Sequence, residues 1–288
     1  ALRLARVAQH EVLDADARRL IDREARELTI DFMQRSKEAS KPFFAYVPIT
    51  QLHFPSLAHP DFIGRTGHGE MADSLAEMDY NVGLIIDAID ELGLADDTIL
   101  LFGSDNGPEF RRPWRGTAGY WRSTYHTAME GSLRVPFMMR WPGHVPEGGV
   151  SDEIVHIADL FPTLLGIAGG DVPSDRVIDG VDQRDFFCGA QEKSNREGFV
   201  YYIKEEMRAA KWRQWKMHFI WEEEVNDGAI KLESPYLFNL IQDPKEETNV
   251  ALEASWVRGA IMRMVHDFRE SLKENPPIPP GTPDPYVP

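Results

Sequence analysis

The chain has 288 residues, of which 42% are hydrophobic and 27% charged, and it contains no apolar run close to the roughly 20 residues that span a membrane. Its 31 basic and 47 acidic residues give a net charge of −16, which disfavours nucleic acid and anionic membranes but leaves room for a small anionic substrate in a locally basic pocket. The single cysteine, Cys188, excludes an internal disulfide and a cysteine-based zinc cluster.

The first elements are a helix and a strand. The chain begins at Ala1 without an initiator methionine, so we expect a processed or truncated product. Apolar residues at spacings of four, three and four, from Ile21 to Phe32, predict a helix that lies on a core. The run "KPFFAYVPI" then predicts a buried strand over residues 43–47.

A second helix and a second strand follow. The helix is predicted by a regular apolar stripe from Leu75 to Leu92, with Gly93 as its left-handed cap. The stretch "TILLFGSDNGPE" contains an unbroken apolar run over residues 98–102, which is typical of a strand covered on both faces of a parallel sheet. Ligands bind outside the carboxyl ends of such strands, where Asp105 and Asn106 lie. The alternative is a turn that binds nothing.

Residues 107–134 are rich in Gly, Arg, Trp and Tyr and show no periodicity, which is typical of a functional loop. Their aromatic side chains either line a site for an aryl or sugar leaving group or form the loop's own small core: Trp114, Tyr120, Trp121 and Tyr125. The segments "VPFMMRWPG" and "SDEIVHIADLFPTLLGIAGG" then predict a strand and a helix.

The pattern changes near Asn195. Short aromatic and β-branched runs, "GFVYYIKEE", "MRAAKWRQWKMHFIW" and "SPYLFNLIQDP", predict an antiparallel sheet. Apolar residues from Val257 to Phe268 predict a final helix. The last 14 residues contain seven prolines and are expected to be an extended strap or disordered.

Taken in order, these pieces resemble the sulfatase family of the alkaline phosphatase superfamily. The matching segments are "KPFFAYVPITQLHFP", "ADDTILLFGSDNGPE", "MEGSLRVPFMMRWPG", "HIADLFPTLLGIAG" and "YLFNLIQDPKEETNVA". The third has the family's Glu-Gly-x-x-Arg-x-Pro pattern. The family's N-terminal motifs, a paired-Asp metal strand and a Cys/Ser-x-Pro-x-Arg motif that provides the formylglycine nucleophile, are absent, and Cys188 is not a candidate.

The resemblance implies an α/β fold, a mostly parallel sheet sandwiched by helices, with a smaller C-terminal antiparallel α+β subdomain. We expect the C-terminal part of the sulfatase core in residues 1–190, the subdomain in residues 191–274 and a Pro-rich tail in residues 275–288. Since the nucleophile and half of the metal site are missing, the isolated chain is expected to be inactive.

The resemblance also assigns metal ligands. Asp105 and Asn106 provide a carboxylate and an amide oxygen, which suit Ca²⁺ or Mg²⁺ better than zinc. Phosphatases of the superfamily generally carry His after the Asp, as a ligand of a second zinc, so Asn106 favours the sulfatase. The implied reaction is metal-assisted hydrolysis of a sulfate ester. The alternatives are a phosphomonoester or phosphonate monoester hydrolase of the superfamily and a non-catalytic fragment.

Three basic residues are candidates for contact with the substrate. By its family position, His53 in "QLHFP" would bind a sulfate oxygen or protonate the leaving group. The family's lysine before the Glu-Gly segment is absent, because residues 106–130 contain no Lys. Arg122 lies nearest to its expected place, and Arg115 is a second candidate. An arginine can bind sulfate through two hydrogen bonds but cannot donate a proton.

Overall fold

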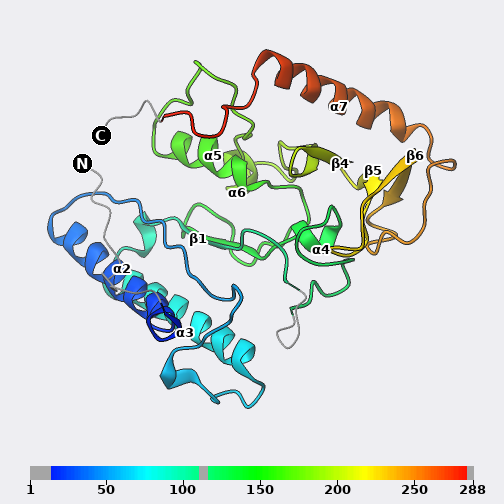
Figure 1. Ribbon diagram of the computed structural model, residues 1–288. Coiled ribbons are helices and arrows are strands. Elements are labelled where there is room, and N and C mark those ends of the chain that lie inside the picture. The colour runs from blue at the N-terminus through cyan, green and yellow to red at the C-terminus, as the bar shows by residue number, and fades with distance from the viewer. Residues whose placement is uncertain (1–13, 110–115, 284–288) are drawn as a thin grey trace. The chain divides into compact units, whose positions relative to one another are not determined.

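The computed structural model describes residues 14–109 and 116–283, and it divides into two compact units (Figure 1). Of the described residues, the first unit comprises 14–100 and 116, and the second comprises 101–109 and 117–283. The two units are described separately below. The division that the sequence predicts at residues 190 and 274 stays a prediction.

Two long helices form the core of the first unit, and both confirm the predicted apolar stripes. They are α2 (Ile21–Glu38) and α3 (Glu70–Glu91), accompanied by α1 (Ala15–Arg18), η1 (Pro60–Phe62) and η2 (Ala95–Asp97). Met33 of α2 packs with Ala88 and Ile89 of α3 to form the core between them. Gly93 follows α3 with a φ of 61°, as expected of a left-handed cap.

The strand predicted over residues 43–47 is wrong. The segment is neither helix nor strand and has no strand pairing among the described residues, and Phe44 and Tyr46 are 77% and 80% exposed. An apolar run indicates that side chains are buried away from water. A strand forms only where a neighbouring backbone pairs with the segment. Phe43 still packs against the core between α2 and α3.

The N-terminal half of the second unit contains a two-stranded sheet of β1 (Leu100–Gly103) and β2 (Phe137–Arg140), which confirms both predicted strands. The short helix α4 (Glu130–Leu133) precedes β2. The predicted helix after β2 is confirmed as η3 (Ile157–Asp159) followed by α5 (Leu160–Ile167), and α6 (Arg184–Phe187) comes next.

The C-terminal half of the second unit is the predicted antiparallel sheet with its final helix. The strands pair in the order β3 (Gly198–Ile203), β4 (Glu206–Trp212), β5 (Trp215–Trp221) and β6 (Ile230–Asn239). α7 (Val257–Glu274) buries Val257, Ile261 and Val265 against Met217 and Leu237 of the sheet.

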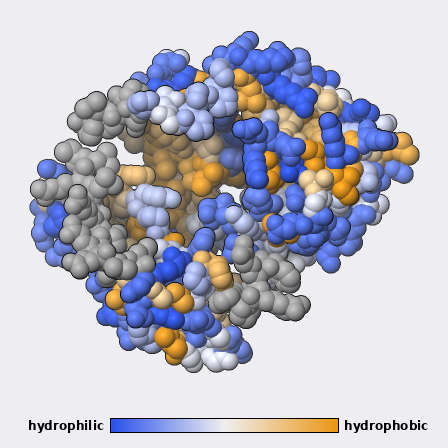
Figure 2. Space-filling model, in the orientation of Figure 1, coloured by the Kyte–Doolittle hydropathy of each residue, from blue (hydrophilic) through white to orange (hydrophobic). Residues whose placement is uncertain are grey.

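Hydrophobic residues are interspersed among polar ones on the face that Figure 2 shows. The exposed large hydrophobic residues include Phe137, Met138 and Phe161. Residues 275–283 of the proline-rich tail form neither helix nor strand. In the part of the chain that the structure describes, no helix has the length and apolarity needed to cross a bilayer.

Candidate active site

Asp105 and Asn106 follow the carboxyl end of β1, as the sequence predicts. Asp105 is exposed, and its Oδ1 accepts a hydrogen bond from the Asn106 amide at 2.9 Å. The Nδ2 of Asn106 donates to the Gly107 carbonyl at 2.9 Å. These bonds leave Oδ2 of Asp105 and Oδ1 of Asn106 as two adjacent hard oxygen donors.

The strand end is tied to the segment around α4. The amide of Gly107 donates to the Ser132 carbonyl at 2.7 Å, and the amide of Tyr125 donates to the Pro108 carbonyl at 2.9 Å. The amide of Gly131 donates in turn to the Arg122 carbonyl at 2.8 Å. These backbone bonds fix the position of Asn106 relative to residues 122–132.

A pocket of about 300 Å³ adjoins Asn106. The loop before α4, α4 itself, His156 and strand β3 provide the rest of its wall, which is largely aromatic. Its lining is Asn106, Tyr125, His126, Thr127, Ser132, Leu133, His156, Phe199, Val200, Tyr201, Tyr202 and Ile203. An apolar wall with a few polar groups suits a ring-shaped organic ligand.

The two histidines of the pocket differ in their surroundings. Nδ1 of the half-buried His156 accepts a hydrogen bond from the Ala158 amide at 3.1 Å, and burial lowers the pKa of this imidazole. His156 is therefore held neutral with its proton on Nε2. His126 is exposed, and its backbone is left-handed with a φ of 65°.

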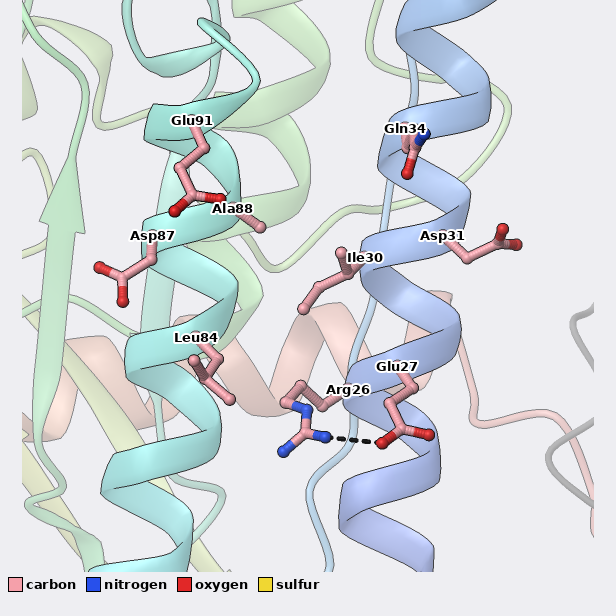
Figure 3. Close-up of a pocket in the computed structure, with 9 residues that line it drawn as sticks. All are labelled: Arg26, Glu27, Ile30, Asp31, Gln34, Leu84, Asp87, Ala88 and Glu91. Carbon is pink, nitrogen blue, oxygen red and sulfur yellow. Dashed lines mark hydrogen bonds and ion pairs between the residues drawn. The ribbon is translucent and has the colours of Figure 1, made fainter.

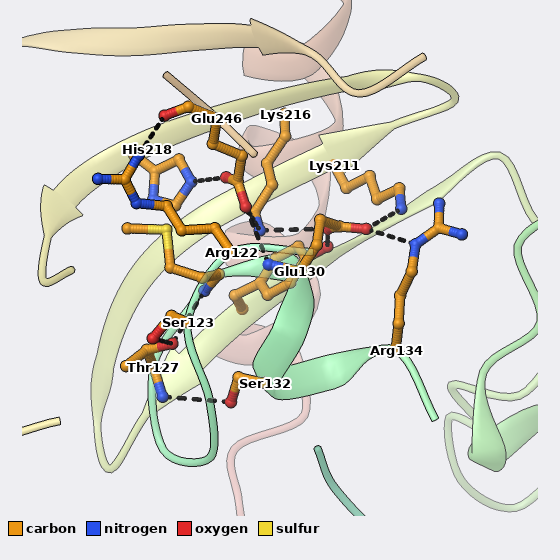
Figure 4. A network of polar contacts seen from close by, with 12 residues as sticks. Arg122, Ser123, Thr127, Glu130, Ser132, Arg134, Lys211, Lys216, His218 and Glu246 are labelled. Atoms are coloured by element: carbon orange, nitrogen blue, oxygen red, sulfur yellow. Dashed lines mark hydrogen bonds and ion pairs between the residues drawn. The ribbon is translucent and has the colours of Figure 1, made fainter. Parts of the chain in front are cut away.

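A buried network of charged groups lies behind α4, with Glu130 at its centre (Figure 4). Oε2 of Glu130 accepts from Arg134 Nε at 2.9 Å and from Lys211 Nζ at 2.8 Å. Oε1 of Glu130 accepts from the hydroxyl of Tyr201 at 3.0 Å and from Lys216 Nζ at 3.1 Å. The network joins the loop segment to strands β3, β4 and β5.

Glu246 is the second carboxylate of the network. Its Oε1 accepts from the Glu130 amide at 2.9 Å and from Lys216 Nζ at 3.2 Å, and its Oε2 lies 2.6 Å from His218 Nε2. Glu130, Lys216, His218 and Glu246 are each no more than 1% exposed. His218 Nδ1 is buried without a hydrogen-bond partner among the described residues.

The network sets the protonation states of its members. Burial alone would raise the pKa of Glu130, but Lys216 and Lys211 outweigh it and hold this pKa well below its usual range. Burial lowers the pKa of His218, with Glu246 opposing the shift, so the imidazole is neutral at pH 7 and its Nε2 hydrogen is donated to Glu246. Burial raises the pKa of Tyr201, which keeps the phenol protonated as a donor to Glu130.

The guanidinium of Arg122 is bound to other groups of the protein. Its Nη1 donates to the carbonyls of Lys245 and Glu246 at 3.2 and 3.1 Å, and its Nη2 pairs with Glu223. The guanidinium also lies 5.3 Å from the centroid of the Trp221 ring. These groups occupy both terminal nitrogens, so the structure ties Arg122 to the C-terminal part of the second unit.

His53 lies in an exposed part of a loop in the first unit. Nδ1 of His53 is 2.6 Å from the Phe54 carbonyl, which leaves Nε2 without a partner among the described residues. The buried carboxylate of Asp22 on α2 accepts from the Thr50 and Gln51 amides at 2.8 and 3.1 Å. The loop that carries His53 is thus anchored to α2.

A hollow of about 440 Å³ between α2 and α3 is a poor site for an anion (Figure 3). Carboxylates dominate its polar lining, namely Glu27, Asp31, Asp87 and Glu91. Its one basic residue, Arg26, is engaged by Asn81 at 2.8 Å and by Glu27 at 2.8 Å. A sulfate or phosphate ester would be repelled there.

Comparison with known proteins decides the family. The family model described as "Sulfatase" matches residues 10–170, and that described as "N-sulphoglucosamine sulphohydrolase, C-terminal" matches residues 120–274. The chain belongs to the sulfatase family. Among curated sulfatases, human arylsulfatase D is 31% identical over 279 residues, which cover 86% of this chain and 47% of the relative. The chain thus spans about half the length of the curated relatives it matches.

Solved structures of other proteins share the fold. The crystal structure of the PsFucS1 sulfatase from Pseudoalteromonas sp. aligns with a TM-score of 0.85 at 24% identity, over 93% of this chain and 56% of that one. BT4656, solved in complex with its substrate D-glucosamine-2-N,6-O-disulfate, aligns with a TM-score of 0.53 at 22% identity, over 72% of this chain and 41% of that one. The likeness confirms the predicted α/β class with a C-terminal antiparallel sheet.

The sulfatase site residues that the sequence predicts are not all brought together. Asp105 and Asn106 lie side by side, but the described ranges contain no group of three His, Cys, Asp or Glu side chains that could hold a metal ion. Arg115 lies outside the described residues, and the substrate roles of His53 and Arg122 stay predictions.

Sequence reasoning missed the pocket histidine His126 and the network of Lys211, Lys216 and Glu246. The one local signal was the Glu-Gly-x-x-Arg-x-Pro segment, in which Glu130 and Arg134 prove to be bonded to each other.

Proposed function

We propose that the protein is a sulfuric ester hydrolase and that this chain contributes two metal ligands and the pocket for the leaving group. The observation that carries the proposal is the Asp105–Asn106 pair, held at a strand end beside an aromatic-lined pocket in a chain of the sulfatase family. Asparagine beside the aspartate supports a single oxygen-ligated cation and not a two-zinc phosphoesterase site.

The donor set fits a hard divalent cation, Ca²⁺ or Mg²⁺. Asp105 Oδ2 and Asn106 Oδ1 would hold it, because hydrogen bonds to protein groups already engage the other atoms of both side chains. When bound, such a cation neutralises negative charge that develops on the sulfuryl oxygens. Two donors do not fill a coordination shell of six or more oxygens, so the remaining ligands must come from outside this chain's described residues.

The substrate class is a sulfate ester of an aryl group or a sugar. The aromatic wall of Tyr125, Phe199 and Tyr201 supports a ring-shaped leaving group. The relatives named arylsulfatase and the neighbour with a disulfated glucosamine substrate support the same class. With a net charge of −16, the chain would attract an anionic ester only through local donors.

Among the basic residues, His53 is the candidate for contact with a sulfate oxygen, since its Nε2 is uncommitted. The contacts of Arg122 with Glu223 and two carbonyls support an anchoring role in preference to a substrate role. Arg115 stays a candidate for binding the sulfate.

We further propose that the 288 residues alone have no turnover. They contain no Cys/Ser-x-Pro-x-Arg motif, so a nucleophile of the formylglycine kind is missing from this chain. The test compares the isolated chain with the full-length protein, each checked by intact-mass spectrometry, on 4-nitrophenyl sulfate. Turnover by the isolated chain would overturn the fragment proposal.

A substrate panel tests the reaction itself. The full-length protein is assayed on 4-nitrophenyl sulfate, 4-nitrophenyl phosphate and a 4-nitrophenyl phosphonate monoester. We expect the highest kcat/KM with the sulfate. A preference for either phosphorus ester would assign the protein to the phosphoesterase side of the superfamily, and no turnover of any ester would favour a non-catalytic role.

A further inference from the structure

We propose that the substrate is a sulfated tyrosine within an extended peptide, whose ring enters the pocket beside Asn106 while its backbone pairs with the free edge of strand β3. This inference rests on the proposed function and names the substrate class of the same site. It is carried by the hydrogen-bonding pattern of the sheet, by the course of the pocket along β3 and by the contrast with the opposite edge of the sheet.

Strand β3 lies at one edge of the four-stranded sheet. Its strand partner among the described residues is β4, with which it pairs antiparallel. The Arg213 amide donates to the Glu197 carbonyl at 2.7 Å, which continues the register of the two strands. In such a ladder the backbone groups of alternate residues face the partner strand. Counted from Glu197, the N–H and C=O groups of Phe199 and Tyr201 face β4, and those of Val200 face the free edge.

Tyr202 presents its backbone in the same direction as Val200. A β-bulge lies between Tyr201 and Tyr202, but its extra residue, Arg208, belongs to β4, so the alternation along β3 is unbroken. Val200 and Tyr202 thus offer two N–H donors and two C=O acceptors, repeated roughly every 6.8 Å along the strand. Alternate residues of an extended peptide match this repeat, whereas a single amide group of a sugar would use only half of the set.

The pocket beside Asn106 runs along this edge. The stacked rings of Phe199 and Tyr201, with centroids 4.6 Å apart, lie on one face of the sheet. Val200 and Tyr202 lie on the other face, toward α7. All four residues line the pocket. Since successive side chains point to opposite faces of a sheet, one pocket borders both sets only where it lies at the edge of the strand.

The pocket has the size and the lining for the ring of a sulfated tyrosine. Its volume is about 300 Å³, and an apolar cavity of about 150 Å³ already holds a benzene ring. Tyr125 and Phe199 provide aromatic surface for the ring, and the proposed cation ligand Asn106 lines the same pocket. A sulfated tyrosine differs from other aryl sulfates because it carries backbone amides, and the edge of β3 offers partners for them.

The opposite edge of the sheet is closed to such pairing. That edge is strand β6, in which Pro235 has no N–H group. The Leu237 amide donates to Asn249 Oδ1 at 2.9 Å, and the Leu237 carbonyl accepts from the Val250 amide at 2.8 Å. Prolines and covering segments are common protection for an edge strand. The edge of β3 has a pocket beside it instead, and an added peptide strand would complete the sheet there.

The reaction is hydrolysis of an aryl sulfate. The bond between sulfur and the phenolic oxygen of the peptide breaks as an oxygen nucleophile bonds to sulfur, and water is the final acceptor of the sulfuryl group. One proton of the water ends on the phenolic oxygen, and the other is released with the sulfate. The products are the unmodified tyrosyl peptide and sulfate.

The test uses the full-length protein and two substrates that contain the same ester. The first is an acetylated pentapeptide amide with O-sulfotyrosine between two pairs of alanines. The second is 4-methylphenyl sulfate, which has the same leaving group without a backbone. We expect the peptide to have a kcat/KM about 10-fold higher or more, mainly through a lower KM, because backbone hydrogen bonds add to its binding.

Two further pentapeptides test the pairing itself. Each carries one N-methyl group, on the sulfotyrosine amide in one and on the next amide in the other. Amides of adjacent residues face opposite sides of a strand, so only one of the two methyl groups lies between the peptide and β3. We expect one isomer to lose about 10-fold or more in kcat/KM and the other to stay within about 3-fold of the parent peptide.

Two variants test the pairing from the side of the protein. Tyr202→Pro removes the ring and the N–H, at a position where an edge strand tolerates proline because the N–H faces away from the sheet. Tyr202→Thr removes the same ring but keeps the N–H. We expect the ratio of kcat/KM for the peptide to that for 4-methylphenyl sulfate to be about 10-fold lower in Tyr202→Pro than in Tyr202→Thr. Turnover of 4-methylphenyl sulfate shows that each variant is folded.

Equal kcat/KM values for the peptide and 4-methylphenyl sulfate, or equal losses in the two N-methyl isomers, would overturn the peptide substrate and leave the sulfatase proposal in place. A higher kcat/KM for N-acetylglucosamine 6-sulfate than for the peptide would also overturn it, with a sugar as the occupant of the pocket. A wild-type protein that hydrolyses no sulfate ester would overturn the proposed function and the inference together.

Discussion

A methyl group added to Gly107 would lie 2.0 Å from the carbonyl oxygen of Gly131. One added to Gly131 would lie 2.3 Å from the Ser123 carbonyl oxygen. The two glycines therefore allow the residues after Asn106 to approach α4 closely enough for the Gly107–Ser132 hydrogen bond of 2.7 Å. Gly107 in "DNG" and Gly131 in "EGS" each lie against backbone atoms that leave no room for a Cβ.

The first prediction concerns Gly107. Gly107→Ala forces carbonyl and Cβ atoms apart in a backbone that the described hydrogen bonds hold in place, so we expect the free energy of unfolding to fall by about 3 kcal/mol. Gly83→Ala in the middle of α3 meets nothing within 4 Å and is the control, expected to stabilise by about 0.5–1 kcal/mol. Urea denaturation measures both. Equal midpoints for the two variants would contradict the close approach.

The second prediction concerns Lys216, whose ammonium group contacts Glu130 and Glu246 with no exposed surface. Lys216→Met leaves both buried carboxylates short of a cation, so we expect a loss of about 3–5 kcal/mol in the free energy of unfolding. Lys273→Met, which removes an exposed ion pair with Glu270, should cost less than about 1 kcal/mol. Chemical denaturation of the two variants is the measurement, and a loss of less than about 1 kcal/mol at Lys216 would contradict the network.

The third prediction is a fall in stability at acid pH. Because the pKa of His218 is lowered in the folded protein, the unfolded chain takes up a proton below about pH 6.5 that the folded protein does not bind. The free energy of unfolding should thus decrease as the pH falls from 7 to 5, by up to about 1.4 kcal/mol per pH unit for this group. The lowered pKa of His156 acts in the same direction.

His218→Gln removes the titrating group and keeps a side-chain donor, so its free energy of unfolding should depend less on pH between 7 and 5. His266→Gln, which removes an exposed imidazole, is the control. Below about pH 4.5 the unfolded chain also binds protons at Glu130 and Glu246 that the folded protein does not, because both pKa values are depressed there, and this adds to the fall. An unchanged slope in His218→Gln would show that its imidazole is not held neutral.

The helices and most strands could be predicted because their signals are local. The stripe from Leu75 to Leu92 has the helical period, and α3 follows it. The exception, the strand expected over residues 43–47, depended on a pairing partner that no local pattern reveals. The place of Asp105 and Asn106 at the end of β1 could be predicted because the apolar run that marks the strand is local. Their role as metal ligands stays a prediction.

The rest of the site could not be predicted because its partners are distant in sequence. Lys211 and Lys216 are 81 and 86 residues from Glu130, and Glu223 is 101 residues from Arg122. The protein partners of the Arg122 guanidinium are likewise distant in sequence, and its role toward the substrate stays a prediction. His126 was indistinguishable from other loop histidines until the structure showed its left-handed backbone and its pocket.

The last prediction concerns the metal. The two free oxygens of Asp105 and Asn106 are too few for a shell of six or more ligands. We therefore expect calorimetry to give the isolated chain a Kd for Ca²⁺ above about 1 mM. In the full-length protein, Ca²⁺ at about 100 times its Kd should add about 2.7 kcal/mol to the free energy of unfolding. Asp105→Asn should abolish that gain, and Asp96→Asn, an exposed carboxylate before β1, should preserve it. Sub-micromolar binding by the isolated chain, or a full gain in Asp105→Asn, would mean that the cation binds elsewhere.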